Sequence, residues 1–477
     1  MSDQRVVYLP PRRPKDECGV FGIYGAERAP QIAYYGLFAL QHRGQESAGI
    51  AASDGQRLKA HRGMGLVSEV FDRSLLEGWE SHLAIGHVRY STTGSSSASN
   101  AQPLVIRYRH GRIALAHNGN LTNAAALRDA LESRGSIFQT TTDTEVIAHL
   151  VAHQCGAGLE AALVAALAQV EGAYALVVMN EHGLIGVRDP NGIRPLSLGR
   201  LGDAWVLASE TCAFDIIGAE FVRDVAPGEM VIIDQTGLRS RQALPAGRPS
   251  LCVFEYIYFA RPDSNLDGRN VHSVRKALGA HLWRDYPVEA DLVTGVPDSS
   301  ISAASGFAEA AGIPFEMGLV KNRYIGRTFI QPDQGTRTAG AKIKYNPLRK
   351  VLEGKRVVLV DDSIVRGTTI RQIVRLLRDA GALEVHLRIS SPPYTNSCYF
   401  GIDTSAPEEL VAASKTVEEI RRETGADSLA YLTVEAMAEA IGLPADRSCV
   451  ACFTGEYPVN IQGAHRKLVM EGEENRD

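Results

Sequence analysis

The first half of the chain predicts many short strands with a few helices between them. Helical spacing of apolar positions occurs at 32–41, 123–132, 144–152 and 159–170. Because strands and helices come in clusters and do not alternate strictly, we expect layered α+β packing. Short apolar runs bounded by glycine or polar residues predict strands at 19–25, 48–52, 84–91, 113–118, 174–179, 184–188, 205–208 and 230–233.

The pattern changes near residue 250. Residues 235–250 are rich in Gly, Pro, Arg and Ser without a period, so we interpret them as a linker. Apolar runs at 291–297, 357–362 and 384–390 then predict buried strands. The second run leads through a loop into a helix. Because strands and helices alternate in this way, we expect a parallel sheet with helices on both faces. That helix carries apolar residues at helical spacing, namely Ile370, Ile373, Val374 and Leu377.

Composition limits the classes of partner. The 477 residues are too many for one ordinary core and predict two or three domains. A net charge of -5 without a basic block argues against nucleic acid, and no apolar run approaches the ~18 residues of a membrane helix. Residues 1–17 lack the apolar segment of a secretory signal, so we expect a cytoplasmic, reducing location. The seven cysteines are then thiols or metal ligands.

The segment VVLVDDSIVRGTT, residues 357–369, places two acids at the end of a strand and a glycine–threonine loop before a helix. A helix N-terminus binds phosphate through its N–H groups, and Gly367 allows close approach. Asp361 and Asp362 suit ribose hydroxyls or a magnesium shell. The nucleotide-binding P-loop spacing is absent. Taken alone, an acidic pair with Thr368 and Thr369 is also typical of an ordinary capped strand end.

Two further segments of the second half carry candidate ligands. The turn TGVPDSS, residues 294–300, offers Ser299 as a magnesium ligand, and an ordinary capped turn is the alternative. The basic segment KNRYIGRT, residues 321–328, offers Lys321 and Arg327 for a pyrophosphate, and a solvated basic loop is the alternative.

Residues 357–369 resemble the signature of type I phosphoribosyltransferases. The resemblance implies an α/β domain with a parallel sheet. It implies that Asp361 and Asp362 contact the ribose and magnesium, and that Arg366, Gly367, Thr368 and Thr369 wrap the 5′-phosphate of phosphoribosyl pyrophosphate.

The first half has polar, glycine-punctuated motifs at its strand ends. Hydrolysis of a carboxamide needs a nucleophile, oxyanion donors and a charged pocket for the amino acid. Cys18 begins the first strand, and by itself it is equally typical of a buried core cysteine. The other motifs are QHRGQ at 41–45, GHVRYST at 86–92, HNGN at 117–120 and TDT at 142–144.

Together these motifs resemble the glutaminase domain of N-terminal-nucleophile amidotransferases, which has an αββα layered fold. The resemblance implies that Cys18 is the nucleophile and that its own α-amine is the base, which requires removal of residues 1–17. It also implies a glutamine site, with Asn118 and Gly119 at the oxyanion, Arg89 at the carboxylate and Asp143 at the ammonium. Arg89 or Asp143 alone is typical of an ordinary ion pair.

A glutaminase half followed by a phosphoribosyltransferase half resembles the glutamine phosphoribosylpyrophosphate amidotransferase family, from Cys18 to about residue 455. The resemblance implies that glutamine and 5-phosphoribosyl pyrophosphate give 5-phosphoribosylamine, pyrophosphate and glutamate, the committing step of purine synthesis. It implies one Mg²⁺ per subunit, inhibition by purine nucleotides, and a homo-oligomer, either a tetramer or a dimer.

The remaining cysteine pattern concerns a metal site. Cys449 and Cys452 have the CxxC spacing of a metal site, and Cys252 and Cys398 are distant candidates for further ligands. From the spacing alone, zinc is the expected metal, and core thiols that bind no metal are the alternative. The resemblance extends to an iron–sulfur branch of the family, and it implies one [4Fe–4S] cluster per subunit on Cys252, Cys398, Cys449 and Cys452. Cys155 and Cys212 are interpreted as core residues.

We therefore expect a leader at 1–17, a glutaminase domain at 18–250, a phosphoribosyltransferase domain at 251–470 and a charged tail at 471–477. Three alternatives stay open. Another N-terminal-nucleophile amidotransferase would lack the 357–369 signature, and a salvage phosphoribosyltransferase would lack the Cys18 domain. A non-enzymatic regulator that senses phosphoribosyl pyrophosphate would tolerate loss of Cys18, Asn118 or Arg89.

Overall fold

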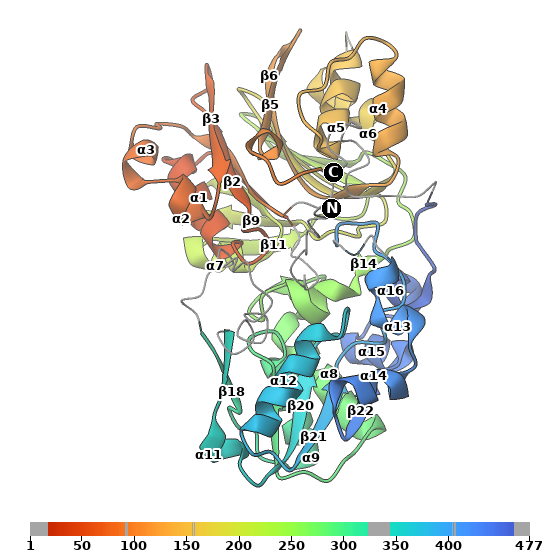
Figure 1. Ribbon diagram of the computed structural model, residues 1–477. Coiled ribbons are helices and arrows are strands. Elements are labelled where there is room, and N and C mark those ends of the chain that lie inside the picture. The colour runs from red at the N-terminus through yellow and green to blue at the C-terminus, as the bar shows by residue number, and fades with distance from the viewer. Residues whose placement is uncertain are drawn as a thin grey trace, which may run out of the picture. The chain divides into compact units, whose positions relative to one another are not determined.

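The computed structural model describes residues 18–461 except 91–93, 155, 157, 323–343, 403, 405 and 406. The chain forms two compact units (Figure 1). The N-terminal unit consists of the described parts of Asp16–His272, Ser397–Ser405 and Leu443–Asp477, and the C-terminal unit consists of those of Ser273–Asn396 and Ala406–Gly442. Two short segments that are distant in the sequence therefore fold with the N-terminal unit.

Two antiparallel sheets build the N-terminal unit. The first has the order β11-β9-β10-β1-β4-β2-β3. Its strands are β1 (Gly19–Tyr24), β2 (Ser47–Ser53), β3 (Leu58–Met64), β4 (Leu83–Arg89), β9 (Ser197–Leu201), β10 (Ala204–Ala208) and β11 (Glu220–Asp224). The second has the order β13-β12-β8-β7-β6-β5. Its strands are β5 (Leu104–Tyr108), β6 (Gly111–Leu121), β7 (Gly172–Met179), β8 (Leu184–Arg188), β12 (Glu229–Asp234) and β13 (Gly237–Gln242).

Strand β1 shows how the sheets stack. Val20 belongs to a core cluster shared with Ala116 and Val177 of the second sheet, whereas Phe21 and Ile23 belong to the cluster beneath the helices on the other face. Because successive strand residues point to opposite faces, β1 is buried on both sides. The helices of the first sheet are α1 (Ala29–Ala39) and α7 (Cys212–Ile217), with the short α2 (Val67–Val70) and α3 (Arg73–Glu77) beside them.

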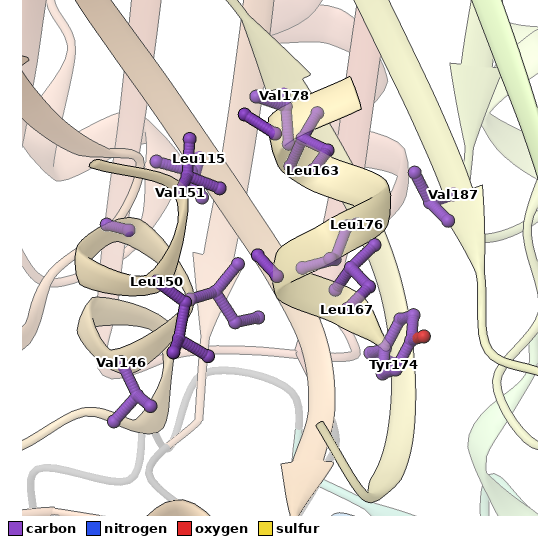
Figure 2. Close-up of a cluster of buried hydrophobic side chains, with 14 of the residues drawn as sticks. Leu115, Val146, Leu150, Val151, Leu163, Leu167, Tyr174, Leu176, Val178 and Val187 are labelled. Carbon is purple, nitrogen blue, oxygen red and sulfur yellow. The ribbon is translucent and has the colours of Figure 1, made fainter. Parts of the chain in front are cut away.

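The second sheet is covered by α4 (Ala124–Glu132), α5 (Asp143–His153) and α6 (Leu159–Leu167). Figure 2 shows Val151 of α5 beside Leu115, and Leu163 and Leu167 of α6 beside Val178 and Leu176, which are strand residues of the same core cluster. Burial of each leucine stabilises the fold by about 1.5–3 kcal/mol. The order helix, sheet, sheet, helix confirms the αββα layering predicted from the sequence.

One of these distant segments pairs with the end of the main stretch of the N-terminal unit. Strand β14 (Leu251–Cys252) pairs in parallel with β23 (Ser448–Cys449), which places Cys252 opposite Cys449. A π-helical turn, η2 (Glu255–Phe259), follows β14, and α16 (Ala451–Thr454) follows β23. The aromatic rings of Phe254 and Phe453 stack with centroids 5.8 Å apart, so they hold these two stretches together.

The C-terminal unit contains a parallel sheet of order β17-β20-β21-β22. Its strands are β17 (Leu292–Gly295), β20 (Arg356–Asp361), β21 (Glu384–Ile389) and β22 (Ser428–Tyr431). Val357 and Leu359 share a core cluster with Ile373 of the helix α12 (Thr368–Asp379), while Val358 and Val360 are buried on the other face. Burial on both faces is typical of parallel sheets, as predicted. Further helices are α8 (Val271–Asp285), α9 (Ile301–Ala311), α11 (Arg349–Leu352), α13 (Val411–Ser414), α14 (Val417–Thr424) and α15 (Val434–Ile441).

The structure corrects the interpretation of the stretch between the two predicted halves. Residues 235–250, predicted to be a linker without structure, contain strand β13, which pairs with β12. Its residues Arg239, Ser240, Arg241 and Gln242 are exposed on the edge of the sheet, so the strand has little apolar signal. No helix among the described residues is long and apolar enough to cross a membrane.

Candidate functional site

Cys18 lies at the start of β1, where its thiol donates a hydrogen bond to the Tyr90 carbonyl at 3.3 Å. Strand β1 runs antiparallel to β4, and Gly19 lies opposite Val88. The beginning of β1 therefore meets the end of β4, from which Arg89 and Tyr90 leave. The side chains of Cys18 and Arg89 are buried at this end of the first sheet.

Asn118 and Gly119 lie near the end of β6 in the second sheet. Asn118 is fully buried, yet neither its Oδ1 nor its Nδ2 has a hydrogen-bond partner among the described residues. Gly119 has a φ of +141°, and a Cβ at this position would lie 2.0 Å from the Ala173 carbonyl oxygen. Only glycine fits there. A buried amide without a partner is costly, so Asn118 is ready to bond a group that enters the site.

Asp143, the first residue of α5, is buried beside the same strand. Its Oδ2 accepts a hydrogen bond from the Leu121 N–H at 3.0 Å, and its Oδ1 lies 3.5 Å from His117 Nδ1. Burial raises the pKa of Asp143, but His117, the Leu121 N–H and the charge of Arg89 oppose burial and hold the pKa below its usual range. Asp143 is therefore ionised, and the positive charge of Arg89 helps to stabilise its carboxylate. A buried pair of opposite charges fits the carboxylate and the ammonium of an amino acid.

Buried polar side chains to which the sequence analysis gave no role surround these residues. The amide of Gln102 accepts from the His117 N–H at 2.9 Å and donates to Thr144 Oγ1 at 3.0 Å. His87 Nε2 lies 2.9 Å from the His117 carbonyl, which only accepts, so Nε2 carries the proton. Burial lowers the pKa of His87 to about 3, so the ring is neutral. His87 and His117 lie in the quoted motifs, whereas Gln102 had no signal in the sequence.

Asp361 and Asp362 meet the Ser299–Ser300 turn in the C-terminal unit. Ser300 Oγ donates to Asp361 Oδ1 at 3.0 Å, and Ser299 Oγ donates to Asp362 Oδ1 at 2.6 Å. Asp362 also accepts from Ser363 Oγ at 2.7 Å, and it forms no salt bridge to a described residue. Both carboxylates are 5% exposed. Two adjacent buried carboxylates with hydroxyl donors form an oxygen-rich site that attracts a hard cation.

The loop after the acidic pair ends at a helix N-terminus. Gly367 is the N-cap of α12 with a φ of +75°, and no side chain caps the helix there. The N–H groups of the first turn are therefore not capped by a side chain, and with the exposed Thr368 and the half-buried Thr369 they form an arrangement that suits an anion. Arg366 forms an ion pair with Glu409.

The basic segment is only partly described. Lys321, at the end of β18 (Leu319–Lys321), donates to Asp298 Oδ2 at 2.7 Å, so the structure brings it to the turn that carries Ser299. Strand β18 pairs with β19 (Tyr345–Pro347). Arg327 lies outside the described residues.

The four candidate cluster cysteines all belong to the N-terminal unit. Cys252 and Cys449 are neighbours across β14 and β23, and the Phe400 N–H donates to Cys398 Sγ at 3.4 Å. Burial raises the pKa of Cys449 to about 12, and burial together with Cys252, Cys449 and Cys398 raises the pKa of Cys452 well above its usual value. The thiols are therefore gathered, and no described cysteine forms a disulfide. Among the described residues no three His, Cys, Asp or Glu side chains are already arranged as ligands of one metal ion.

Comparisons with known proteins agree with both halves. A glutamine amidotransferase domain model matches residues 87–215, and a phosphoribosyl transferase domain model matches residues 266–395. A solved structure described as the allosteric regulatory enzyme of purine biosynthesis is 56% identical, with a TM-score of 0.92 over 95% of this chain and 99% of that chain. Another, glutamine phosphoribosylpyrophosphate amidotransferase from B. subtilis complexed with ADP and GMP, is also 56% identical, with a TM-score of 0.89 over 93% and 98%.

A curated relative gives the same result from sequence. The amidophosphoribosyltransferase of Bacillus subtilis (strain 168) is 57% identical over 451 residues, which are 94% of this chain and 95% of that protein. With such identity over nearly its whole length, the chain belongs to the amidophosphoribosyltransferase family.

Proposed function

We propose that this chain catalyses the reaction of its family, in which glutamine, water and 5-phosphoribosyl pyrophosphate give glutamate, 5-phosphoribosylamine and pyrophosphate. The observation that carries the proposal is the pairing, in one chain, of two buried sites of different chemistry. The first contains the Cys18 thiol, the Arg89 cation, the Asp143 anion and the side-chain amide of Asn118, which has no hydrogen-bond partner among the described residues. The other joins an acidic pair to an uncapped helix N-terminus.

Glutamine would lie between the charged side chains of the first site. Arg89 is suited to its carboxylate by the planar fork of the guanidinium, and Asp143 is suited to its ammonium because it stays ionised. These two contacts leave the carboxamide to be placed against the thiol. The pocket therefore selects an amino acid by its two charges before any bond changes.

The Cys18 thiol would then attack the carboxamide carbon. Its α-amine takes the thiol proton and later gives it to the leaving nitrogen, so ammonia departs and a thioester remains for water to cleave. The Asn118 Nδ2–H and the Gly119 N–H would hold the oxyanion, which supplies the acceptor that Asn118 Nδ2 lacks. This role of the amine requires removal of residues 1–17, which lie outside the described residues.

The second site would receive phosphoribosyl pyrophosphate. Its 5′-phosphate suits the N–H groups of α12 from Gly367 onward, and its ribose hydroxyls suit the acidic pair. Asp361, Asp362 and Ser299 have the oxygen donors that Mg²⁺ prefers, so they would hold one ion, and a bound ion would offset the negative charge of pyrophosphate. Lys321 would add a cation for the pyrophosphate, and Arg327 belongs to the same proposal.

The gathered thiols fit the iron–sulfur branch. Cys252, Cys398, Cys449 and Cys452 provide four sulfur donors, and because burial raises the pKa of Cys449 and Cys452, their thiolates would need a positive charge beside them. A metal cluster supplies that charge and stabilises the thiolates. We propose that these residues hold one [4Fe–4S] cluster, with zinc as the alternative. Cluster and thiols both need a reducing compartment, which is consistent with the predicted cytoplasmic location.

Two further properties of the family belong to the proposal. The B. subtilis relative was solved with ADP and GMP, so purine nucleotides are the inhibitors to test first. A homo-oligomer, either a dimer or a tetramer, is the expected assembly.

The proposal is tested by comparing the amounts of glutamate and pyrophosphate that the chain releases. Purified chain is incubated with glutamine, phosphoribosyl pyrophosphate and Mg²⁺, and glutamate and pyrophosphate are measured over time. Equal amounts of both are expected, and a chelator of Mg²⁺ should stop pyrophosphate release. Glutamate formed without pyrophosphate would instead favour another amidotransferase, and release of neither product would favour the non-enzymatic regulator.

A further inference from the structure

A buried network of charges reaches the backbone of Cys18. Arg43, in the QHRGQ motif, donates from Nε to the Cys18 carbonyl at 3.0 Å. Its Nη1 donates to Glu210 Oε1 at 2.5 Å and to Glu255 Oε2 at 2.9 Å, and its Nη2 donates to Glu255 Oε1 at 2.7 Å. The planar guanidinium is therefore fixed by a two-point contact with Glu255, and its third nitrogen is aimed at Cys18.

The network continues beyond Glu255. Arg194 lies 3.4 Å from Glu255 Oε1, and its Nε and Nη2 donate to the Phe400 carbonyl at 2.9 and 2.6 Å. Glu210 accepts from Ser264 Oγ at 2.7 Å and lies 2.8 Å from His42 Nε2. Glu255 thus stands between two arginines that hold different stretches of backbone.

Stability alone does not explain this arrangement. The side chains of Arg43, Arg194, Glu210 and Glu255 are all 0% exposed. Removing an ion from water costs several kcal/mol, and well-packed apolar side chains of similar volume are often equally stable or more stable. What the charges provide and apolar groups do not is a fixed direction for the Arg43 Nε–H.

Cys18 has a particular need for such a fixed donor. As the first residue of a processed chain it would have a neighbour on one side only, and chain ends move unless other groups hold them. Its thiol contacts the Tyr90 carbonyl and its own carbonyl contacts Arg43. The neighbouring Gly19 is tightly packed, because a Cβ there would lie 2.9 Å from Val88 Cγ2 and 3.2 Å from Leu40 Cβ.

We propose that Glu255 is a positioning residue for glutamine hydrolysis, which through Arg43 fixes the Cys18 carbonyl and so directs the thiol toward the carboxamide. This inference rests on the proposed role of Cys18. Glu255 acts on the position of the nucleophile and leaves glutamine binding to Arg89 and Asp143. Its removal should therefore lower kcat and leave KM for glutamine nearly unchanged.

The test compares Glu255→Gln with the full-length wild type. Glutamine-dependent kcat should fall about 100-fold, as expected for a nucleophile displaced by about 1 Å, while KM stays within about twofold. Synthesis from added ammonium salt should be unchanged, because it bypasses Cys18. Glu255→Asp, which keeps the charge, should recover part of the lost rate and serves as the second variant if Glu255→Gln folds poorly.

Glu229→Gln is the matched control. Glu229 forms the same kind of two-point ion pair with Arg223, at 2.7 and 2.8 Å, in the same unit. Its glutamine-dependent kcat should stay within about twofold of the wild type, since Glu229 bonds Arg223 and the Ala226 N–H and not Arg43 or Cys18.

The outcomes separate this inference from the proposed function. A selective fall of kcat supports it; equal losses of the glutamine and ammonia reactions in Glu255→Asp, a rise in KM alone, or wild-type kcat in Glu255→Gln would overturn it. Cys18→Ala is measured beside these variants. If Cys18→Ala still uses glutamine, the proposed nucleophile is wrong; if it does not while Glu255→Gln is fully active, only the positioning role fails.

Discussion

Replacing Asn118 with alanine should lower the rate of glutamine hydrolysis without lowering the stability of the N-terminal unit. The side chain is fully buried, but its Oδ1 and Nδ2 have no hydrogen-bond partner among the described residues. Such an amide weakens the resting fold. It gains a partner only when an oxyanion forms beside it, as expected of a group preorganised for a transition state.

The two effects have opposite signs. Loss of one oxyanion donor lowers the rate about 100- to 1000-fold, or about 2.7–4 kcal/mol of transition-state stabilisation. Each unsatisfied buried polar atom costs about 1–3 kcal/mol, and a small cavity costs about 1 kcal/mol or more. Two such atoms together cost about 2–6 kcal/mol, so removing them and leaving a cavity should raise the free energy of unfolding by about 1–5 kcal/mol.

The assay measures both quantities on the same protein. Glutamate release gives kcat and KM for glutamine, and urea unfolding gives the free energy of unfolding. Asn100→Ala is the control for stability, because Asn100 is equally buried but donates to Ser95 O and Thr141 Oγ1 and accepts from Thr141 N. It should lose at least about 2 kcal/mol, because these partners become unsatisfied.

Two results would refute the reasoning. A large loss of stability in Asn118→Ala, similar to that in Asn100→Ala, would show that the amide has partners in the folded protein. A glutaminase rate near that of the wild type would remove Asn118 from the oxyanion site, whatever its stability.

Three further predictions concern other groups. Asp362→Asn keeps the size of the side chain but removes the charge, so both glutamine- and ammonia-dependent synthesis should fall at least about 100-fold in initial-rate assays; full ammonia-dependent synthesis would exclude Asp362 from the phosphoribosyl site. Cys452→Ser should lower the iron and sulfide content of protein purified without oxygen; unchanged iron would exclude Cys452 as a ligand, and zinc in the wild type would favour the alternative metal. Because burial lowers the pKa of His87 from 6.5 to about 3, the unfolded chain binds a proton that the folded chain excludes between these values. The contribution of His87 to the free energy of unfolding should thus be lost as pH falls below about 6.5, by about 1.4 kcal/mol per pH unit, and His87→Gln should flatten the pH dependence measured by urea unfolding at pH 7, 6 and 5. An unchanged slope would contradict this assignment.

The sequence predicted the elements whose residues carry a strong period. Strand β8 has the predicted bounds, and α12 has its apolar residues on one face, because burial on one or two faces imposes the pattern directly. Strand β13 was missed, since its edge residues are exposed and any polar side chain suits them. Strand β11 is exposed in the same way and was not predicted either.

The candidate site was predictable only in part. The motifs named Cys18, Arg89, Asn118 and Asp143, and the structure places Arg89 and Asp143 close enough to interact electrostatically. The partners of Arg43 were not predictable, because Glu210 and Glu255 are 167 and 212 residues away and have no local signal. For the same reason the sequence did not show that residues 397–402, 404 and 443–461 fold with the N-terminal unit. Long-range pairing depends on the whole fold, whereas a motif reports only its own neighbourhood.

The most direct test of the account is covalent labelling of the nucleophile. The purified chain is treated with a diazoketone analogue of glutamine, and intact mass and peptide mass spectrometry locate the adduct. We predict one adduct per chain, on a Cys18 that is the first residue, with loss of glutamine-dependent synthesis and full retention of ammonia-dependent synthesis. An adduct on another residue, or labelling of Cys18 that leaves glutamine use intact, would contradict the central claim.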